Sequence, residues 1–316
     1  MENIVQGQWL RGPSADLGDE ISQSVRFRGP QRMTGPDQMP TGNFTVSFWY
    51  KRALGPNSTQ TFLMFGPNQA YQLYPTSGHN QLHSRRGSSV GTALTGGLDD
   101  HGAWYHIVLV NTSGTTTCYV NGVLQSGTES TPSGSSVMTI GSNSNSLQDD
   151  RLSGYLAEYN LLDGQTLAAT DFGRFNEDNI WVPKELSFTS AQYGDRGFRL
   201  TFDSTQSSGI GTDSAPTGTG HAAANNWTAT DFDTTAISSS NFDNDVDYFD
   251  TPTSNYATSN PINSINQEAE EANLRTRASG GTSDPDPAGL TVYKIPSDGD
   301  FYFECMTDYG VDNNYG

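Results

Sequence analysis

The chain has 316 residues, enough to bury a substantial core, and 16% of them are charged. Its 34 glycines, many Ser, Thr, Asn and Asp residues and few long amphipathic helical patterns favour an all-β protein with many turns. The net charge of −19 lies mainly in the second part: residues 1–183 carry 10 Lys and Arg against 15 Asp and Glu, and residues 184–316 carry 6 against 20. Phosphate binding needs clustered Lys and Arg, so this balance excludes a nucleic-acid surface.

Membrane insertion and secretion leave their own sequence signatures. No apolar run reaches the length of a bilayer span. Residues 1–20 lack the basic segment and apolar core of a secretory signal. We therefore expect no membrane span and no signal peptide.

Short alternating segments that end at Gly or Pro fill residues 24–162, and their spacing predicts a β-sandwich or jelly roll. The clearest is FTVSFWYKRA, residues 44–53, with Phe44, Val46, Phe48 and Tyr50 on one face. Thr45, Ser47, Trp49 and Lys51 lie on the other. The further strand candidates are 24–29, 59–66, 70–75, 81–87, 103–110, 116–127, 136–142 and 152–162.

Residues 104–123, WYHIVLVNTSGTTTCYVNGV, read as a β-hairpin whose two strands are joined by NTSGTT, residues 111–116. The second strand ends in Asn121-Gly122, a pair typical of turns that need positive φ. His106 alternates with apolar neighbours on its strand, so we expect a buried, hydrogen-bonded ring rather than a metal ligand.

The chain after the closing strands is less regular. We expect a helical turn over 168–175 capped by Thr170, a surface crossing at 180–185 and a strand FRLTFD at 198–203. Ser, Thr, Asn and Asp then dominate, which predicts an acidic linker over 236–289 that holds one short helix, at 265–278. Two more strands, at 290–295 and 300–308, predict the start of a second β module over 290–316.

AWYHIVLVNTSGTTTCYVNGVLQSG, residues 103–127, resembles the W-Y-H…L-Y-V-N-G-V core of laminin-G-like, concanavalin A-like lectin domains. SVRFRG, FTVSFWYKRA and MTIGSNSNSLQDDRLSGYLAEYNLLDGQTL fit the same family in order, so the resemblance covers about 24–167. It implies a concanavalin A-like jelly-roll sandwich. The opening stretch of that family has its counterpart at 198–232, after the closing strands, which implies a circularly permuted domain over 24–235 behind an N-terminal segment, 1–23.

A second resemblance concerns GYLAEYNLLDGQTLAATDFGRF and the following IWVPKE, residues 154–185. This run is similar to a pattern in tail-fibre-like virion proteins of marine phages. The resemblance implies a virion protein assembled in the host cytoplasm, with other virion proteins and host surface glycan as partners. It also implies a homo-oligomer, with a trimer favoured.

Catalytic chemistry finds little support in the sequence. Related jelly-roll glycosidases carry E-x-D-x-x-E on one strand, which this chain lacks, and its nearest pair, Glu158 and Asp163, has the wrong spacing. We expect Glu158 to share a face with Leu156 and Leu162 and to bond a neighbouring loop. No P-loop, dinucleotide fingerprint or G-x-S-x-G elbow occurs, so we expect no catalytic residues, no enzyme activity and no firm cofactor.

Calcium is the one metal to consider, at Asp149 and Asp150, because laminin-G-like domains often bind Ca²⁺ in the corresponding loop. The run DNDVDYFD, residues 243–250, opens like an EF-hand but lacks the Gly and the closing Glu of that loop, so we expect a solvated acidic turn. Cys118 and Cys305 lie far apart in sequence, and we expect two free thiols.

These observations together predict a non-enzymatic phage tail-fibre or surface-fibre protein that mediates attachment through its lectin-like domain. Two alternatives stay open. One is a purely structural adaptor or decoration protein that uses the sandwich for protein–protein contacts. The other is a degenerate polysaccharide hydrolase, for which two carboxylates in one cleft would be needed.

Overall fold

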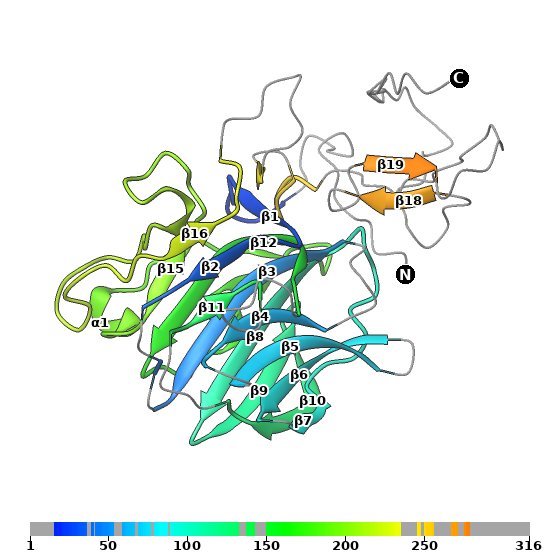
Figure 1. Ribbon diagram of the computed structural model, residues 1–316. Helices are drawn as coiled ribbons and strands as arrows, with labels where there is room; N and C mark the ends of the chain where they lie inside the picture. Colours follow the sequence, from blue (N-terminus) through cyan, green and yellow to red (C-terminus); the bar gives the residue numbers. More distant parts are fainter. Residues whose placement is uncertain are drawn as a thin grey trace.

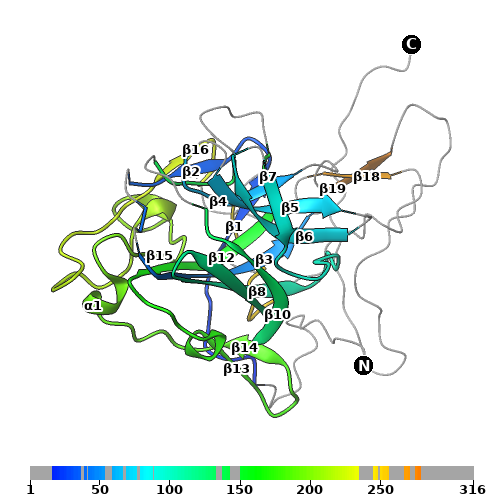
Figure 2. The same cartoon turned by 90° about the horizontal axis from the view of Figure 1, so that it is seen from below.

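The computed structural model describes residues 16–36, 39–40, 42–53, 59–66, 69–76, 79–87, 89–132, 137–142, 150–234, 245–247, 250–255, 267–270 and 275–278. Two antiparallel sheets face each other and form a sandwich, as Figure 1 and the edge-on view in Figure 2 show. The predicted all-β jelly-roll class is confirmed.

The larger sheet has eight strands. Its order is β10 (Val123–Ser130), β9 (Thr115–Val120), β8 (Trp104–Thr112), β3 (Phe44–Arg52), β12 (Ser153–Asp163), β1 (Ser24–Arg28) and β17 (Val246–Asp247), and β15 (Phe198–Leu200) also pairs with β12. The longest strands, β3, β8 and β12, lie side by side at its centre. They position the site described below.

The second sheet has seven strands, which cover one face of the first. Its order is β16 (Thr228–Thr230), β2 (Arg32–Thr34), β11 (Thr139–Ile140), β4 (Gln60–Met64), β5 (Gln69–Thr76), β6 (His79–Arg86) and β7 (Ser89–Ala93). The remaining elements are η2 (Ala169–Asp171), β13 (Gly173–Phe175), β14 (Trp181–Pro183), α1 (Ser190–Tyr193), η3 (Gly209–Gly211), β18 (Gln267–Glu270) and β19 (Arg275–Ala278).

Strand β3 shows why the sheet is buried on both faces. Its apolar face, predicted from the alternation, packs in the core between the sheets through Phe44, Val46, Phe48 and Tyr50. Its other face is buried too, since Trp49 belongs to a second apolar cluster with Trp104, Tyr155, Phe172 and Trp181. Figure 2 shows β13 and β14 beyond this outer face of the larger sheet. Segments outside the sandwich therefore cover a face that an isolated jelly roll would leave wet.

Both turns predicted around the central hairpin are confirmed. Ser113 and Gly114, between β8 and β9, have φ of 52° and 82°, and Asn121 and Gly122, between β9 and β10, have φ of 47° and 77°. Positive φ at two successive residues is what a tight hairpin turn requires. His106 is fully buried and hydrogen-bonded, also as predicted.

The strand predicted at 198–203 joins the sandwich. Phe198, Arg199 and Leu200 of β15 pair with Leu161, Asn160 and Tyr159 of β12. The position of this strand agrees with the permuted arrangement that the resemblance implies. The permutation itself stays a prediction.

Three local predictions are wrong. A helical turn does form within 168–175, as η2, and β13 follows it, but its N-cap is Ala168 rather than the predicted Thr170; the Ala168 N–H donates to the Asp171 carboxylate at 2.9 Å. Residues 181–183 form a buried strand rather than a surface crossing. The helix expected at 265–278 is a two-stranded antiparallel sheet, β18 with β19.

The predicted linker over 236–289 is also wrong for residues 245–247 and 250–255, which pack against the sandwich. Strand β17 pairs with β1, and Asp245 accepts a hydrogen bond from Arg28 at 2.8 Å. Asp245 and Asp247 are buried, so the solvated acidic turn expected there is wrong for these two carboxylates. The burial of Asp245 depends on its ion pairs with Arg26 and Arg28 of β1, which composition alone does not show.

Several predictions fall outside the described residues. These concern Asp149, Asp243, Cys305 and the strands at 290–316, and with them the second β module. Cys118 is buried and free. In the part of the chain that the structure describes, no helix is long and apolar enough to cross a bilayer.

Candidate functional site

A pocket of about 260 Å³ opens on the outer face of the larger sheet. Its floor is formed by β3, β8 and β12, and its walls come from the chain around 19–21 and 183–186. The residues that line it are Asp19, Glu20, Ile21, Ser47, Trp49, His106, Glu158, Phe172, Pro183, Lys184, Glu185, Leu186 and Arg199. Four carboxylates and two cationic groups therefore surround a partly aromatic floor.

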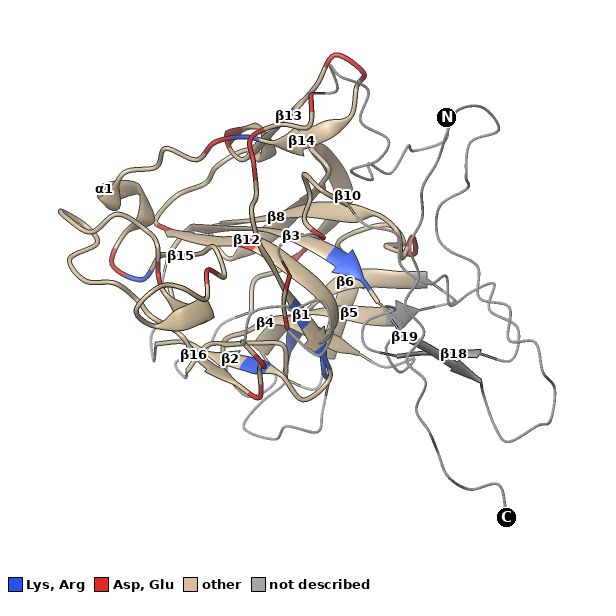
Figure 3. Ribbon diagram, turned by 90° about the horizontal axis from the view of Figure 1, so that it is seen from above, with Lys and Arg blue, Asp and Glu red and all other residues tan. Residues whose placement is uncertain are grey.

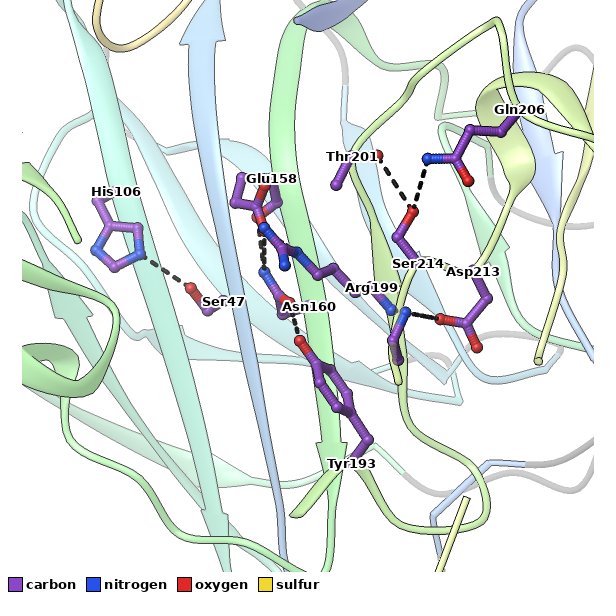
Figure 4. A network of polar contacts seen from close by, with 11 residues as sticks. Ser47, His106, Glu158, Asn160, Tyr193, Arg199, Thr201, Gln206, Asp213 and Ser214 are labelled. Atoms are coloured by element: carbon purple, nitrogen blue, oxygen red, sulfur yellow. Dashed lines mark hydrogen bonds and ion pairs between the residues drawn. The ribbon is translucent and has the colours of Figure 1, made fainter. Parts of the chain in front are cut away.

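A chain of hydrogen bonds runs through the floor from Trp181 to Ser47. The Trp181 indole N–H donates to His106 Nδ1 at 3.0 Å, and His106 Nε2 lies 2.9 Å from Ser47 Oγ. The indoles of Trp49 and Trp181 also stack on the His106 imidazole. The distance between ring centroids is 4.7 Å for Trp49 and 5.9 Å for Trp181. Figure 4 shows the His106–Ser47 contact on the adjacent strands.

The direction of this chain follows from its first donor. An indole N–H only donates, so His106 Nδ1 must accept, and the neutral ring carries its proton on Nε2. His106 is therefore the donor to Ser47 Oγ. Burial lowers the pKa of His106 to about 3, so the ring stays neutral near pH 7. The Ser47 hydroxyl hydrogen is left to donate to a group in the pocket.

Glu158 reaches the pocket because β12 contains a bulge. The pairing of β12 with β3 shifts between Ala157 and Asn160, and Glu158 has a φ of 47°. Leu156 packs in the core between the sheets, whereas Leu162 belongs to the outer cluster. The prediction that Glu158 shares a face with both is wrong, because the extra residue breaks the two-residue alternation.

The Glu158 carboxylate is fixed by Arg199 of β15, not by a neighbouring loop as predicted. Arg199 Nε donates to Glu158 Oε1 at 2.6 Å, and Asn160 Nδ2 donates to the same oxygen at 3.3 Å. Tyr193 in turn donates to Asn160 Oδ1 at 2.9 Å. Figure 4 shows this network at the edge between β12 and β15. Side-chain exposure is 13% for Glu158 and 28% for Arg199, so a bound molecule can still reach both groups.

A buried carboxylate holds β15 in place beneath Arg199. Asp213 accepts from the backbone N–H groups of Arg199 and Ala215 at 2.9 Å and of Asn225 at 2.7 Å. His221 Nε2 also lies 3.0 Å from Asp213 Oδ2, with both side chains fully buried. Asp213 thus joins β15 to the 213–225 segment and sets the position of the Arg199 side chain.

Of the two residues predicted to bind calcium, Asp150 is among the described residues and Asp149 is not. Asp150 accepts from Gln72 Nε2 at 3.0 Å and forms an ion pair with Arg85 at 3.3 Å. Calcium binding at Asp149 and Asp150 stays a prediction. Among the described residues, no three His, Cys, Asp or Glu side chains gather closely enough to hold a metal ion.

The sequence analysis considered two of the pocket's residues in other roles, Glu158 as a carboxylate that bonds a loop and His106 as a buried ring. It placed Ser47 and Trp49 only on the second face of their strand. Ser47 and Arg199 were missed as site residues. The alternation of β3 places Ser47 and Trp49 together on the outer face, but only the β3–β8 register, in which Trp49 pairs with His106, brings the imidazole beside them.

The fold and this site define a lectin-like β-sandwich with a covered outer face. Residues 28–170 match the family model described as the concanavalin A-like lectin/glucanases superfamily. No curated protein matches the chain in sequence.

Solved structures give distant likenesses. A native heptameric SAP-like pentraxin from Limulus polyphemus is 17% identical, with a TM-score of 0.36 over 48% of this chain and 80% of that one. A putative carbohydrate binding protein from Bacteroides ovatus is 14% identical, with a TM-score of 0.41 over 66% and 58% of the two chains. Domain 4 of the arabinanase AbnA from Geobacillus stearothermophilus, solved with arabinotriose, is 22% identical, with a TM-score of 0.32 over 42% and 65%. The alignment spans less than two thirds of each of the last two chains.

Proposed function

We propose that this protein is a non-enzymatic attachment protein that binds glycan in the outer-face pocket. The observation that carries the proposal is the set of groups at the pocket's floor. Ser47 has a hydroxyl hydrogen to donate, Glu158 offers carboxylate oxygens and Arg199 offers guanidinium N–H groups beside an aromatic wall. Adjacent sugar hydroxyls, which both donate and accept, complement such a set.

The charge of the lining favours one class of sugar. Asp19, Glu20, Glu158 and Glu185 outnumber Lys184 and Arg199. Anionic sugars would meet a net negative wall, so we infer that neutral or amino sugars bind best.

Two observations support binding without hydrolysis. A serine nucleophile needs a histidine that accepts its proton, whereas His106 Nε2 donates to Ser47. The E-x-D-x-x-E run of related glycosidases is missing from the sequence. The first observation disfavours a serine-nucleophile mechanism, and the second disfavours the degenerate polysaccharide hydrolase, which needs a carboxylate pair.

A virion location is the biological setting that we propose. The support is the resemblance of residues 154–185 to marine phage tail-fibre-like proteins. In that setting the protein works as a homo-oligomer, with a trimer favoured, and it binds other virion proteins at one end and host surface glycan at the other. The oligomer is tested by mass measurement in solution on the full chain and on a chain that ends near Ser279. Monodisperse monomers of both at micromolar concentration would refute it.

A glycan array probed with the full chain tests the binding proposal. We expect hits among neutral or amino sugars, and titration calorimetry on the best hit gives the affinity. Ser47→Ala should weaken binding by about fivefold, since one hydrogen bond is worth about 1 kcal/mol. Ser84→Ala is the matched control, because Ser84 is also buried but lies on β6 of the opposite sheet.

The other outcomes distinguish the alternatives. An array with no hits, or an affinity that Ser47→Ala and Glu158→Gln both leave unchanged, would overturn glycan binding in this pocket. Release of reducing sugar from host polysaccharide that Glu158→Gln abolishes would instead establish the hydrolase. A chain that binds no glycan but binds another virion protein would support the adaptor.

A further inference from the structure

The outer face of β3 carries a lysine that is sealed from water. Lys51 is 0% exposed, and its Nζ lies 2.8 Å from Asp250 Oδ2 and 2.8 Å from Asn255 Oδ1. Asp250 and Asn255 are themselves only 1% and 3% exposed. The three side chains meet where the basic end of β3, blue in Figure 3, is covered by the segment 250–255.

Aromatic rings and one further acid surround this cluster. The Trp104 indole N–H donates to Asp250 Oδ1 at 3.0 Å, and the Lys51 ammonium lies 5.9 Å from the centre of the Tyr155 ring. Asp247 Oδ1 accepts from the Asp250 backbone N–H at 2.9 Å. A lysine and an aspartate buried together in such surroundings lose several kcal/mol of hydration each, so an outcome that removes both charges is favoured.

The side-chain carbonyl group of Asn255 faces the Lys51 amine. Asn255 Nδ2 donates to the Gly102 carbonyl at 2.9 Å, which turns Oδ1 toward Lys51. Cγ lies about 1.23 Å beyond Oδ1, so Nζ is at most about 4 Å from that carbon. This separation is close to the 3–3.5 Å of a near-attack arrangement.

We propose that Lys51 and Asn255 form an intramolecular amide bond, in a reaction that Asp250 assists as general base and acid. The Lys51 ammonium gives one proton to the Asp250 carboxylate, and the neutral amine attacks Asn255 Cγ. The bond from Cγ to Nζ forms and the bond from Cγ to Nδ2 breaks. Asp250 passes its proton to the departing nitrogen and takes up the second proton from Nζ, so ammonia leaves and Asp250 ends protonated.

The surroundings of Asp250 suit this role. Burial raises the pKa of Asp250, which favours the neutral acid that the reaction leaves behind. The product replaces a sealed ion pair with a neutral amide and a neutral carboxyl group. No oxidant or other co-reactant is needed.

Asn255 rather than Asp250 is the electrophile. An ionised carboxylate resists attack by an amine, because its carbon already bears two electron-rich oxygens, whereas an amide carbon is attacked when its nitrogen is protonated as it leaves. Asp250 also holds the Trp104 indole through its second oxygen. Attack on Asp250 would release water instead of ammonia, and the experiment below separates the two.

The bond would tie the segment 250–255 covalently to the central strand β3. In an attachment protein, a pull on the chain after residue 255 would then reach β3 directly rather than peel β17 from the edge of the sheet. The proposed bond depends only on the cluster of Lys51, Asp250 and Asn255, and it does not require that the protein binds glycan.

Mass spectrometry of the purified full chain, denatured before injection, tests the inference. We expect a mass lower than the sequence mass by one ammonia molecule, and a digest in which the peptide with Lys51 is joined to the peptide with Asn255. Lys51→Arg and Asp250→Asn should restore the full mass. Lys184→Arg, at an exposed lysine, is the mass control and should keep the deficit.

The wild-type result does not depend on whether any variant folds. A full sequence mass for the wild type, with unlinked peptides, would overturn the proposal. A deficit of one water molecule, with Lys51 joined to Asp250, would also overturn it by moving the bond to the carboxylate. A deficit that persists in Asp250→Asn would refute the assigned role of Asp250.

Discussion

The two ends of one sheet face differ sharply although the same strands build both. At one end, a pocket lies over Ser47 and His106 of β3 and β8, and a ligand can reach the partly exposed Glu158 and Arg199 that line it. At the other end, Lys51 of β3 pairs with Trp104 of β8, and the segment 250–255 seals both from water. The strand alternation is the same throughout, so the covering segments, rather than the sheet, decide which end can bind a ligand.

The difference is also one of chemistry. The sealed end brings Lys51 and Asp250 together away from water, an arrangement that tolerates the loss of neither side chain. The open end uses a neutral imidazole whose orientation is set by an indole. We expect substitutions at the sealed end to affect mainly folding, and substitutions at the open end to affect mainly binding.

The largest expected effect is at the sealed end. Asp250→Ala should lower the free energy of unfolding by about 3–5 kcal/mol, because it leaves Lys51 as an uncompensated buried charge. Urea denaturation measures the change. The exposed Asp178→Ala is the control, and we expect it to stay within about 0.5 kcal/mol of the wild type. Equal stabilities for the two variants would show that the cluster does not hold the segment 250–255.

The next largest effect concerns pH and His106. Its pKa falls from 6.5 to about 3 on folding, so the unfolded chain binds a proton between these values that the folded chain does not. Stability is therefore lost as the pH falls from 6.5 toward 3, by about 1.4 kcal/mol per pH unit from this group. His106→Gln should have a shallower slope in denaturation measured at several pH values. Parallel curves for the two proteins would contradict a neutral buried imidazole.

A smaller effect tests how Trp181 is held at the open end. A Cβ at Gly122 would lie 2.3 Å from the Trp181 ring, whereas Gly114, with a similar positive φ, has nothing within 4 Å of the same position. Both Gly→Ala changes strain the backbone, but only Gly122→Ala displaces the ring. We expect thermal or urea unfolding to show an extra loss of about 1–3 kcal/mol for Gly122→Ala. Equal losses would mean that Trp181 moves freely.

The smallest effect separates the adaptor alternative from glycan binding. Val123 and Leu124 of the edge strand β10 are 55% and 58% exposed. Val123→Ser and Leu124→Ser should change stability by less than about 0.5 kcal/mol and leave glycan affinity unchanged. A loss of virion assembly or of oligomer in these variants would identify this edge as a protein interface.

The fold was more predictable than the site, for physical reasons. Alternation in β3 and the Asn121-Gly122 turn are local signals, and both were predicted from the sequence. The bulge at Glu158 and the burial of Asp245 and Asp250 depend on partners more than 40 residues away, such as Arg199 and Lys51. The run 245–255 has few apolar residues and therefore resembled a linker. Composition does not show that carboxylates in this run are buried beside basic groups.

The central claim is that the open end binds glycan while the sealed end does not. Nuclear magnetic resonance of the indole N–H groups, assigned through Trp→Phe variants, tests it during titration with the best glycan from the array. We predict shifts for Trp49, which lines the pocket, and for Trp181, which donates to His106, and none for Trp104 at the sealed end. A shift at Trp104 with Trp49 and Trp181 unmoved would contradict the account.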